Sequence, residues 1–521
     1  MSKVFLLPLV TAALLGGAAL AEAAAEPVAG GEAKKLFAEY CAECHGQNRL
    51  GGIGPALIPQ TLARKGAKLV LETITQGRPQ TQMAGFAEQF TGDQIAALAA
   101  YVGTPLAQVP KWGAGQITAS RVVNPDYVPA PAPVYDADPY NLFVVVETGD
   151  HHVTILDGDR FEPLTRFATR YALHGGPKFT PDGRFVFFMS RDGWVTKYDL
   201  WSLQIVAEVR AGINSRNIAI SADGRHIAVA NYLPHSLVIL SADDLNVAKI
   251  IDIVDAKGKT SRVSAVYQAA PRSSFILALK DIPEIWEVFY GEDPPFIGFV
   301  HDYRIEGPPK LNDPFPVRKI GLDDYLDNFF FVPGYEYLIG TPRDARNAQV
   351  VDLVIGKKIA DIDIAGLPLL GSGIPWSWNG RPVMATPHLK DARISIIDTT
   401  DWSVIKTLKT LGPGFFMRSH DNSPYVWADV FFGPNKDVLH VFDKASVEIV
   451  KTLRPAPGKT AAHIEFDRDG SHAIVSVWDD DGAIVIYDSQ TLEEVKRIRM
   501  RKPSGKYNVW NKITLEDGTS H

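Results

Sequence analysis

Short runs in which apolar and polar residues alternate dominate the chain from about residue 140 onward. Most of these runs end near an aspartate or a serine, and turn sequences such as Pro181-Asp182-Gly183-Arg184 and Ala222-Asp223-Gly224-Arg225 separate them. Almost no helical periodicity is present in this part of the chain. The pattern therefore predicts β-strands that are joined by tight turns.

The strand runs recur at a nearly constant spacing. Six of them share one phrase, and they occupy residues 153–157, 196–199, 237–241, 394–398, 438–443 and 484–488. Their last residues are separated by 42, 42, 45 and 45 residues, and a seventh run ends at Asp352, 46 residues before Asp398. The 111 residues from Ser241 to Asp352 leave room for one more unit and an insertion near residues 294–316. This period predicts an all-β eight-bladed propeller over residues 136–514.

The first residues have the pattern of a secretory signal. Lys3 precedes the apolar run 4–20, and small residues suited to signal peptidase follow at 19–21 and 21–23. We expect residues 1–23 to be a cleaved signal peptide and the mature protein to lie in the periplasm with no membrane span. The alternative is a retained anchor, which requires about 20 apolar residues.

Both cysteines of the chain lie in one motif, Cys41-Ala42-Glu43-Cys44-His45. C-x-x-C-H is the attachment signature of a c-type haem, in which the two thiols form thioethers and the histidine binds the iron. The alternatives are a redox disulfide or half of a zinc site, but no second ligand pair follows nearby. The motif predicts covalent haem c, with Cys41 and Cys44 as tethers and His45 as iron ligand.

The sequence around this motif predicts a small all-α cytochrome c domain over residues 27–109. We expect a helix at 32–40 and a closing helix at 95–102, which the capping box of Thr91 and Gln94 precedes. Gly54-Pro55 resembles the proline turn that supports the haem-binding histidine in class I cytochromes c. Met83 is the expected sixth iron ligand, with a gap-filling core methionine as the alternative. The proline-rich residues 110–135 are predicted to be a linker.

Composition narrows the choice of function further. Hydrophobic residues make up 46% and charged residues 22% of the 521 residues, and the formal net charge is −7. These values are typical of a globular protein, and they give no reason to expect a nucleic-acid partner. Two cysteines also exclude a disulfide-rich scaffold.

A cytochrome c domain followed by an eight-bladed propeller resembles the cytochrome cd1 family, in which the propeller holds haem d1. Short phrases in a shared order carry the resemblance, and they occupy residues 171–174, 190–192, 199–201, 215–217, 231–232, 385–389, 476–478 and 505–509. The resemblance implies that His174 is the proximal ligand of the d1 iron. A structural histidine is the alternative.

The resemblance also implies residues that contact the d1 macrocycle. Its carboxylates would meet arginines and a tyrosine, and aromatic rings and a glycine would lie against it; these are Arg191, Arg216, Tyr232, Arg262, Arg393, Phe416, Trp478 and Gly505. For each arginine, a solvated blade turn is the alternative. We expect the pair His151-His152 to lie at a solvated hairpin end, because adjacent strand residues point to opposite faces.

One segment departs from the family pattern. The nitrite reductases of the family carry two distal histidines, whereas the matching segment here, residues 366–371, has leucine in place of the first, and His388 remains. Loss of a cationic donor weakens anion binding. The chain thus resembles the branch that dehydrogenates a propionate of dihydro-haem d1 to the acrylate and passes electrons to haem c. His388 would act as general base or second axial ligand.

This reading makes the protein an oxidoreductase of haem d1 biosynthesis, with dihydro-haem d1 as substrate and haem d1 as product. It also implies a periplasmic electron acceptor and transient contact with cytochrome cd1 nitrite reductase and other d1-assembly proteins. The alternatives are a nitrite reductase that forms nitric oxide, a non-catalytic haem d1 carrier, and an electron-transfer propeller without d1.

Overall fold

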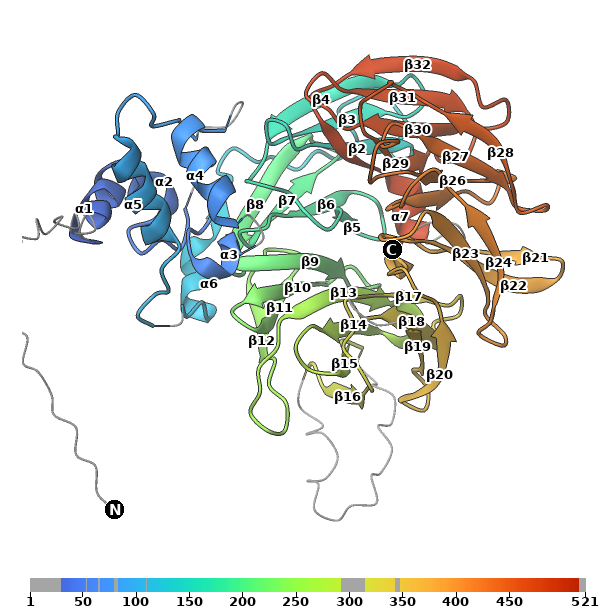
Figure 1. Cartoon of the computed structure of the whole chain (residues 1–521), viewed down its shortest axis with the longest axis horizontal. Helices are drawn as coiled ribbons and strands as arrows, with labels where there is room; N and C mark the ends of the chain where they lie inside the picture. Colours follow the sequence, from blue (N-terminus) through green and yellow to red (C-terminus); the bar gives the residue numbers. More distant parts are fainter. Residues whose placement is uncertain are drawn as a thin grey trace, which may run out of the picture.

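The computed structural model of the protein describes residues 30–52, 54–63, 66–78, 83–108, 110–291, 314–342 and 347–514. The predicted signal peptide lies outside these residues, as does most of the insertion predicted near 294–316. Within the described ranges, no helix is both long and apolar enough to cross a membrane. Figure 1 shows a small helical domain beside a ring of β-sheets.

The helical domain contains the helices before residue 110. They are α1 (Gly30–Leu36), a π-helical turn η1 (Phe37–Cys41), α2 (Ala42–His45), α3 (Pro59–Leu62), α4 (Gly66–Gln76) and α5 (Gly92–Val102). The predicted capping box is present at α5, where Thr91 Oγ1 accepts from the Gln94 N–H and Gln94 Oε1 accepts from the Thr91 N–H. Phe37, Leu98 and Val102 are among the buried residues that pack these helices together.

Eight antiparallel sheets form the ring, as the sequence repeat predicted. From the inner to the outer strand, the first four are β33 (Pro503–Asn508), β2 (Leu142–Glu147), β3 (His152–Asp157), β4 (Glu162–Ala168); β5 (Lys178–Phe179), β6 (Phe185–Met189), β7 (Trp194–Asp199), β8 (Gln204–Arg210), β1 (Val122–Val123); β9 (Asn214–Ile220), β10 (His226–Leu233), β11 (Ser236–Ser241), β12 (Val247–Asp252); and β13 (Val263–Ala269), β14 (Ser274–Leu279), β15 (Glu284–Phe289), β16 (Val317–Gly321).

The remaining four sheets complete the ring in chain order. They are β17 (Asn328–Phe331), β18 (Tyr337–Thr341), β19 (Asn347–Asp352), β20 (Lys357–Asp363); β21 (Ile374–Trp378), β22 (Arg381–Pro387), β23 (Arg393–Asp398), β24 (Val404–Lys409); β25 (Met417–Ser419), β26 (Tyr425–Asp429), β27 (Leu439–Asp443), β28 (Glu448–Leu453); and β29 (Ala461–Phe466), β30 (His472–Val477), β31 (Ala483–Asp488), β32 (Glu494–Arg499). Short 3-10 turns η2 (Ala270–Arg272) and η3 (Leu370–Ser372) and the last helix α7 (Val509–Thr514) lie between or after the strands.

The repeated phrase of the sequence corresponds to the third strand of each blade. The seven runs are β3, β7, β11, β19, β23, β27 and β31, and β15 is the unit expected in the gap between Ser241 and Asp352. These strands are buried on both faces between neighbouring blades, which explains why their apolar runs are the most regular in the sequence. The blade count is therefore confirmed.

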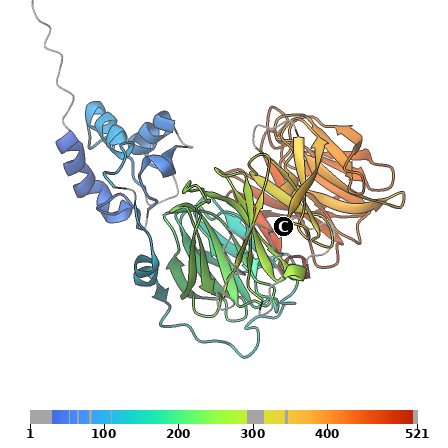
Figure 2. The same cartoon turned by 90° about the horizontal axis from the view of Figure 1, so that it is seen from below.

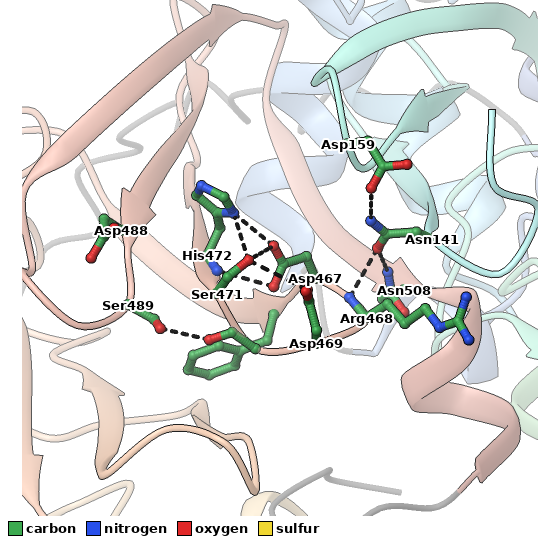
Figure 3. Close-up of polar contacts among 12 residues, drawn as sticks. Asn141, Asp159, Asp467, Arg468, Asp469, Ser471, His472, Asp488, Ser489 and Asn508 are labelled. Carbon is green, nitrogen blue, oxygen red and sulfur yellow. Dashed lines mark hydrogen bonds and ion pairs between the residues drawn. The ribbon is translucent and has the colours of Figure 1, made fainter. Parts of the chain in front are cut away.

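The C-terminal strand closes the ring by pairing with the first blade. β33 is antiparallel to β2, with Phe143 opposite Asn508. Figure 3 shows the polar contacts at this junction. Asn141 Oδ1 accepts from Asn508 Nδ2 at 3.0 Å and from the Arg468 N–H at 2.9 Å, while Asn141 Nδ2 donates to Asp159 at 2.7 Å. The side-chain amide of Asn141, which precedes β2, thus bonds both the C-terminal strand β33 and the turn between β29 and β30 of the last blade.

The proline-rich segment predicted as a linker is more ordered than a linker. It contains α6 (Ala114–Ser120) and β1, which adds a fifth strand to the edge of β8. Ile117 of α6 is fully buried among propeller side chains, and Trp112 Nε1 donates to the carbonyl oxygen of Arg210 at 2.8 Å. Figure 2 shows this segment running along the propeller after it leaves the helical domain. The segment therefore fixes the position of one domain on the other.

A small apolar core also joins the two domains directly. Ala56 and Ile58 of the helical domain pack with Ile213 and Leu233 of the propeller. All four side chains are buried. This contact holds the helical domain against the blade formed by β9 to β12, so that its cavity faces the propeller.

Candidate functional site

The first cavity, of about 590 Å³, lies in the helical domain and contains every residue predicted to hold haem c. Cys41, Cys44, His45 and Met83 all line it. Both cysteines are free thiols. Apolar side chains from α3, α4 and α5 complete the wall, as a haem in a low-dielectric site requires.

His45 is oriented by the proline turn that the sequence predicted. Its Nδ1 donates to the carbonyl oxygen of Pro55 at 2.8 Å, which leaves the lone pair on Nε2 for a metal. Gly54 packs against the imidazole, because a Cβ at this position would lie 2.8 Å from Cε1 of His45. The free thiols, the oriented imidazole and the thioether of Met83 together fit a covalent haem c, which supplies one-electron redox chemistry when bound.

The propeller contributes part of the wall of this haem c cavity. Asp150, His151 and Tyr171 line it from the propeller side. Arg78 of the helical domain donates to Tyr171 Oη at 3.0 Å, and the rings of His151 and Tyr171 lie 5.1 Å apart. His151 does lie at the hairpin end between β2 and β3, as the sequence predicted, but it is half-buried at a domain contact rather than solvated. Burial lowers the pKa of His151, so this imidazole is neutral at pH 7.

The second cavity, of about 470 Å³, occupies the axis of the propeller. Each blade contributes from its innermost strand or from the turn beside it, and α7 contributes Lys512. Of the predicted d1-site residues, the cavity brings together His174, Arg216, Phe416, Trp478 and Gly505. Figure 1 shows α7 near the centre of the ring.

His174 stands on the segment before β5 and is held by its backbone neighbours. Its Nδ1 donates to the carbonyl oxygen of Arg216 at 2.8 Å. This bond directs the Nε2 lone pair toward the guanidinium groups of Arg216, at 2.8 Å, and Arg191, at 3.0 Å. An imidazole with one nitrogen anchored and the other basic is suited to axial ligation of iron. The two arginines next to it are suited to carboxylates of the same ligand.

Buried cations line the side of the cavity near α7. Arg418 binds Glu465 through both carboxylate oxygens, at 3.1 and 2.7 Å, and both side chains are nearly fully buried. Lys512 lies 3.9 Å from the same carboxylate. Burial lowers the pKa of Lys178 to about 8. Two or more positive charges against one negative charge give this wall a net attraction for an anionic ligand.

A row of neighbouring aromatic rings forms another part of the cavity wall. Centroid distances are 5.0 Å for Tyr507 and His463, 4.9 Å for His463 and Phe416, 6.2 Å for Phe416 and Phe431, and 5.4 Å for Phe431 and Trp478. A flat, largely apolar macrocycle is matched by such a wall. We call these five side chains the aromatic wall.

His388 is not at this cavity, although the sequence placed it there. Its side chain is fully buried, and its Nε2 lies 2.8 Å from Ser395 Oγ on β23. Burial lowers the pKa of His388 to about 4. The predicted role of base or second axial ligand is corrected by this placement, because the ring is enclosed within its own blade.

Three further predicted residues lie away from the cavity lining. Arg262 binds Asp281 through two nitrogens, at 2.8 and 2.5 Å, and lies over the ring of Tyr232. Arg393 donates to the carbonyl oxygen of Ala365 at 2.7 Å. Each arginine thus has a local structural partner, which was the alternative that the sequence left open. The structure does not support their predicted contact with the macrocycle.

Several residues that line the axial cavity were not predicted from the sequence. They are Lys178, Tyr267, Phe415, Arg418, Phe431, His463, Glu465, Tyr507 and Lys512. They come from five different blades and from α7, so no local motif connects them. The alternation of apolar and polar residues along the innermost strands is the one signal that could have indicated them. This alternation does not reveal which face of a strand points toward the propeller axis.

Comparison with known proteins agrees with these two cavities. The family described as "Cytochrome D1 heme domain" matches residues 137–304 and 309–512, and the one described as "Cytochrome C oxidase, cbb3-type, subunit III" matches residues 29–102. The chain is 52% identical over 509 residues, 98% of each chain, to "Dihydro-heme d1 dehydrogenase" of Pseudomonas aeruginosa. It is 27% identical over 99% of each chain to "Nitrite reductase" of Stutzerimonas stutzeri.

A solved structure shows the same architecture. It is described as "Dihydro-heme d1 dehydrogenase NirN in complex with DHE", and it matches with a TM-score of 0.87 and 52% identity over 92% of this chain and 100% of the other. The family match covers most of the propeller and the full-length relative covers both domains. The chain therefore belongs to the cytochrome D1 haem domain family, with a cytochrome c domain at its N-terminal side.

Proposed function

We propose that this protein is a dihydro-haem d1 dehydrogenase, which oxidises a propionate side chain of its substrate to an acrylate. The observation that carries the proposal is the axial cavity of the propeller, which combines His174, a cationic wall and the aromatic wall. The 52% identity to a dehydrogenase with that activity in its name extends over both domains.

The substrate binds through its iron, its carboxylates and its flat face. His174 offers Nε2 to the iron, and Arg216 and Arg191 are within reach of that atom, so they can pair with carboxylates near the ring. The aromatic wall packs against the macrocycle and excludes water from it.

The segment that carries a distal histidine in the nitrite reductases supports dehydrogenation over nitrite reduction. Here Leu369 and Gly371 of this segment line the cavity. Neither side chain donates a proton or binds an anion, and both steps are needed to reduce nitrite. An apolar distal wall is instead compatible with a reaction in which no external anion enters.

Electrons leave the cavity toward the cytochrome domain. Leu173 and His174 line the propeller cavity, and Tyr171, three residues earlier, lines the haem c cavity. The two sites are therefore joined by one short backbone segment. A haem c held by Cys41, Cys44 and His45 would supply one-electron chemistry, so a two-electron oxidation would need two transfers to an external acceptor.

Spectroscopy of the purified holoprotein with dihydro-haem d1 and an oxidant tests the proposal. We expect the absorption change that accompanies acrylate formation. We also expect the pigment extracted after the reaction to be haem d1. Unchanged pigment after oxidation would favour a carrier, and fast turnover of nitrite to nitric oxide would favour a reductase; either result contradicts the proposal.

A pair of variants tests the mode of binding. Arg216→Gln is expected to weaken substrate binding about tenfold or more, because a hydrogen bond to a charged group contributes about 1.5–3 kcal/mol. Arg225→Gln is the matched control, since Arg225 pairs with Asp223 in an exposed turn. Equal loss in both variants would contradict the assigned carboxylate contact.

The wider setting of the reaction follows from its chemistry. We place the mature protein in the periplasm, with residues 1–23 as the cleaved signal. Its product must be released to a protein that uses haem d1, and we infer transient contact with cytochrome cd1 nitrite reductase and with other d1-assembly proteins. Export fractionation and cross-linking to that reductase test these two points.

A further inference from the structure

A third cavity, of about 210 Å³, continues the axial cavity along the innermost strands of three blades. We call it the α7 cavity, because Asn511 of α7 lines one side of it. On β9, Asn217 lines the axial cavity, and the later residues Ala219 and Ile220 line the α7 cavity. The same order holds on β5 and β13. The two cavities therefore follow one another from the start to the end of these strands.

The outer end of the α7 cavity lies at the turns that follow these innermost strands. Pro181 lies in the turn between β5 and β6, and Ala222 lies in the turn between β9 and β10. Pro181 is exposed, and Ala222 is half-buried. The α7 cavity therefore extends from the axial cavity to the surface of the propeller.

Lys178, Tyr267 and Lys512 lie at the boundary between the two cavities, because each of them lines both. Lys512 lies 3.9 Å from Glu465, but Lys178 forms no ion pair with any described residue. Burial lowers the pKa of Lys178 to about 8, and the positive charge of Lys178 helps to lower the pKa of Lys512. Lys178 can therefore both release and accept a proton near neutral pH.

The α7 cavity also contains a buried acceptor that no described residue satisfies. Asn511 is nearly fully buried, and its Oδ1 has no hydrogen-bond partner among the described residues. Its Nδ2 donates to the carbonyl oxygen of Phe466 at 2.9 Å, which fixes the orientation of the amide. Buried polar atoms of this kind are satisfied by water, and the α7 cavity has room for several water molecules. Its lining is thus suited to a chain of water molecules.

The other two titratable groups at the boundary are less suited to pass a proton. Burial raises the pKa of Tyr267, so its phenol keeps its proton at neutral pH. Lys512 is held toward the axial cavity, where it lies near Glu465 and over the ring of Tyr507 at 5.6 Å. Lys178 has no such partner among the described residues, so its ammonium group can reach both cavities.

We propose that Lys178 passes protons from the axial cavity to the α7 cavity, through which they reach solvent. This inference rests on the proposed function. Conversion of –CH2–CH2– to –CH=CH– releases two protons and two electrons, and the external acceptor takes up the electrons through haem c. A macrocycle packed on the aromatic wall excludes water from the axial cavity. The α7 cavity then offers the protons a path that does not pass the ring.

The passage of each proton leaves Lys178 unchanged. The ammonium group breaks one N–H bond as it gives a proton to water in the α7 cavity. The resulting amine forms one N–H bond as it takes a proton that was released in the axial cavity. One proton is thereby moved, and no other reactant is consumed.

Two substitutions separate proton transfer from charge. Lys178→Met removes both, whereas Lys178→Arg keeps the positive charge but does not release a proton, because a guanidinium group stays protonated. Lys358→Met is the matched control, since Lys358 pairs with Asp323 and Asp361 on the outer strand β20. Lys178→Met also removes a buried charge without a partner, so the unfolding midpoint of this holoprotein should not fall below that of wild type.

The expected result separates proton release from substrate binding. Both Lys178 variants bind dihydro-haem d1 with a Kd within about threefold of wild type and give the same spectrum of the bound pigment. Single-turnover acrylate formation with excess oxidant slows by about tenfold or more in both. The ratio of the rates in H2O and D2O rises in both, because proton release has become the slow step. Lys358→Met keeps the rate and the ratio of wild type.

A second pair of variants tests the path itself. Ala222→Phe fills the outer end of the α7 cavity without changing a residue of the axial cavity. Ala445→Phe, at an exposed turn of another blade, is its control. We expect Ala222→Phe to slow acrylate formation and to raise the isotope ratio, as the Lys178 variants do. The double variant Lys178→Met/Ala222→Phe should be no slower than the slower single variant, because both changes act on one path.

Four results would overturn the assignment. Wild-type rates in both Lys178 variants refute the relay and leave the proposed function intact. A normal rate in Lys178→Arg beside a slow Lys178→Met makes Lys178 a cationic anchor for a carboxylate instead. A normal rate in Ala222→Phe shows that the protons do not leave through the α7 cavity. A wild type that binds but never oxidises the pigment refutes the proposed function and this inference with it.

Discussion

The guanidinium group of Arg78 donates a hydrogen bond to Tyr171 Oη across the boundary between the two domains, at 3.0 Å. Tyr171 also lies three residues before His174, which faces the axial cavity. The short segment 171–174 therefore lines the haem c cavity at one end and the axial cavity at the other. This arrangement places the domain contact directly between the two cavities.

Tyr171→Phe is expected to slow the reduction of haem c after substrate is added. A hydrogen bond contributes about 1 kcal/mol net, which corresponds to up to about fivefold in the population of the docked domain arrangement. Stopped-flow absorbance of haem c measures the rate. Tyr325→Phe, on an exposed residue of another blade, is the control. Equal rates in wild type and Tyr171→Phe would show that this bond has no part in domain docking.

Met83→His is expected to lower the midpoint potential of haem c. A thioether stabilises ferrous iron, and exchange for imidazole favours the ferric form; axial ligands set haem potentials over a range of roughly 0.8 V. Spectroelectrochemistry gives the potential. Met384→Leu, which alters a buried propeller methionine, should leave it unchanged. An unshifted potential in Met83→His would mean that Met83 is not the sixth ligand.

Local motifs were sufficient to predict the main features of the cytochrome c domain. The proline turn at His45 and the capping box at Thr91 depend on residues close in sequence, so spacing alone specifies them. The blade count was equally accessible, because the buried third strands repeat at a near-constant interval. Closure by β33 left no such trace, since it pairs residues more than 350 positions apart.

Only some residues of the axial cavity could be predicted from the sequence. The others depend on which face of each innermost strand points toward the cavity. His388 stands in a phrase typical of the family, yet Ser395 holds it inside its blade. His463 stands in no recognisable motif, and a one-residue bulge brings it to the cavity. A register shift of one residue exchanges the two faces of a strand, and sequence alternation does not reveal it.

His472 is expected to stabilise the propeller more at acidic than at alkaline pH. Its Nδ1 lies 2.7 Å from Asp467 Oδ2 beside the ring closure, as Figure 3 shows, and this bond raises the pKa of His472 above 6.5. Folding therefore favours the protonated ring. The contribution is fully present below the unfolded pKa of about 6.5 and is lost as the pH rises through the folded pKa.

Urea unfolding of wild type and His472→Gln across pH 5.5 to 9 measures this contribution. We expect the difference in the free energy of unfolding to be about 1 kcal/mol at the acidic end and to decrease at the alkaline end. His226→Gln provides a comparison, because burial lowers the pKa of His226 and reverses the sign. A difference that is constant with pH would contradict the assigned ion pair.

Arg418→Met is expected to destabilise the propeller strongly, although Arg418 lies at a ligand cavity. The substitution leaves the carboxylate of Glu465 buried with Lys512 at 3.9 Å as its nearest remaining cation. Loss of one partner of a buried ion pair costs about 3–5 kcal/mol, and the lysine should hold the cost toward the lower value. The double variant Arg418→Met/Glu465→Leu removes both charges, and we expect it to recover most of the loss. Denaturant unfolding of wild type, the single variant and the double variant measures the free energy of unfolding of each. If the double variant is less stable than Arg418→Met, the attraction between Arg418 and Glu465 exceeds the cost of burying their charges. The ion pair would then stabilise the fold in addition to attracting an anionic ligand.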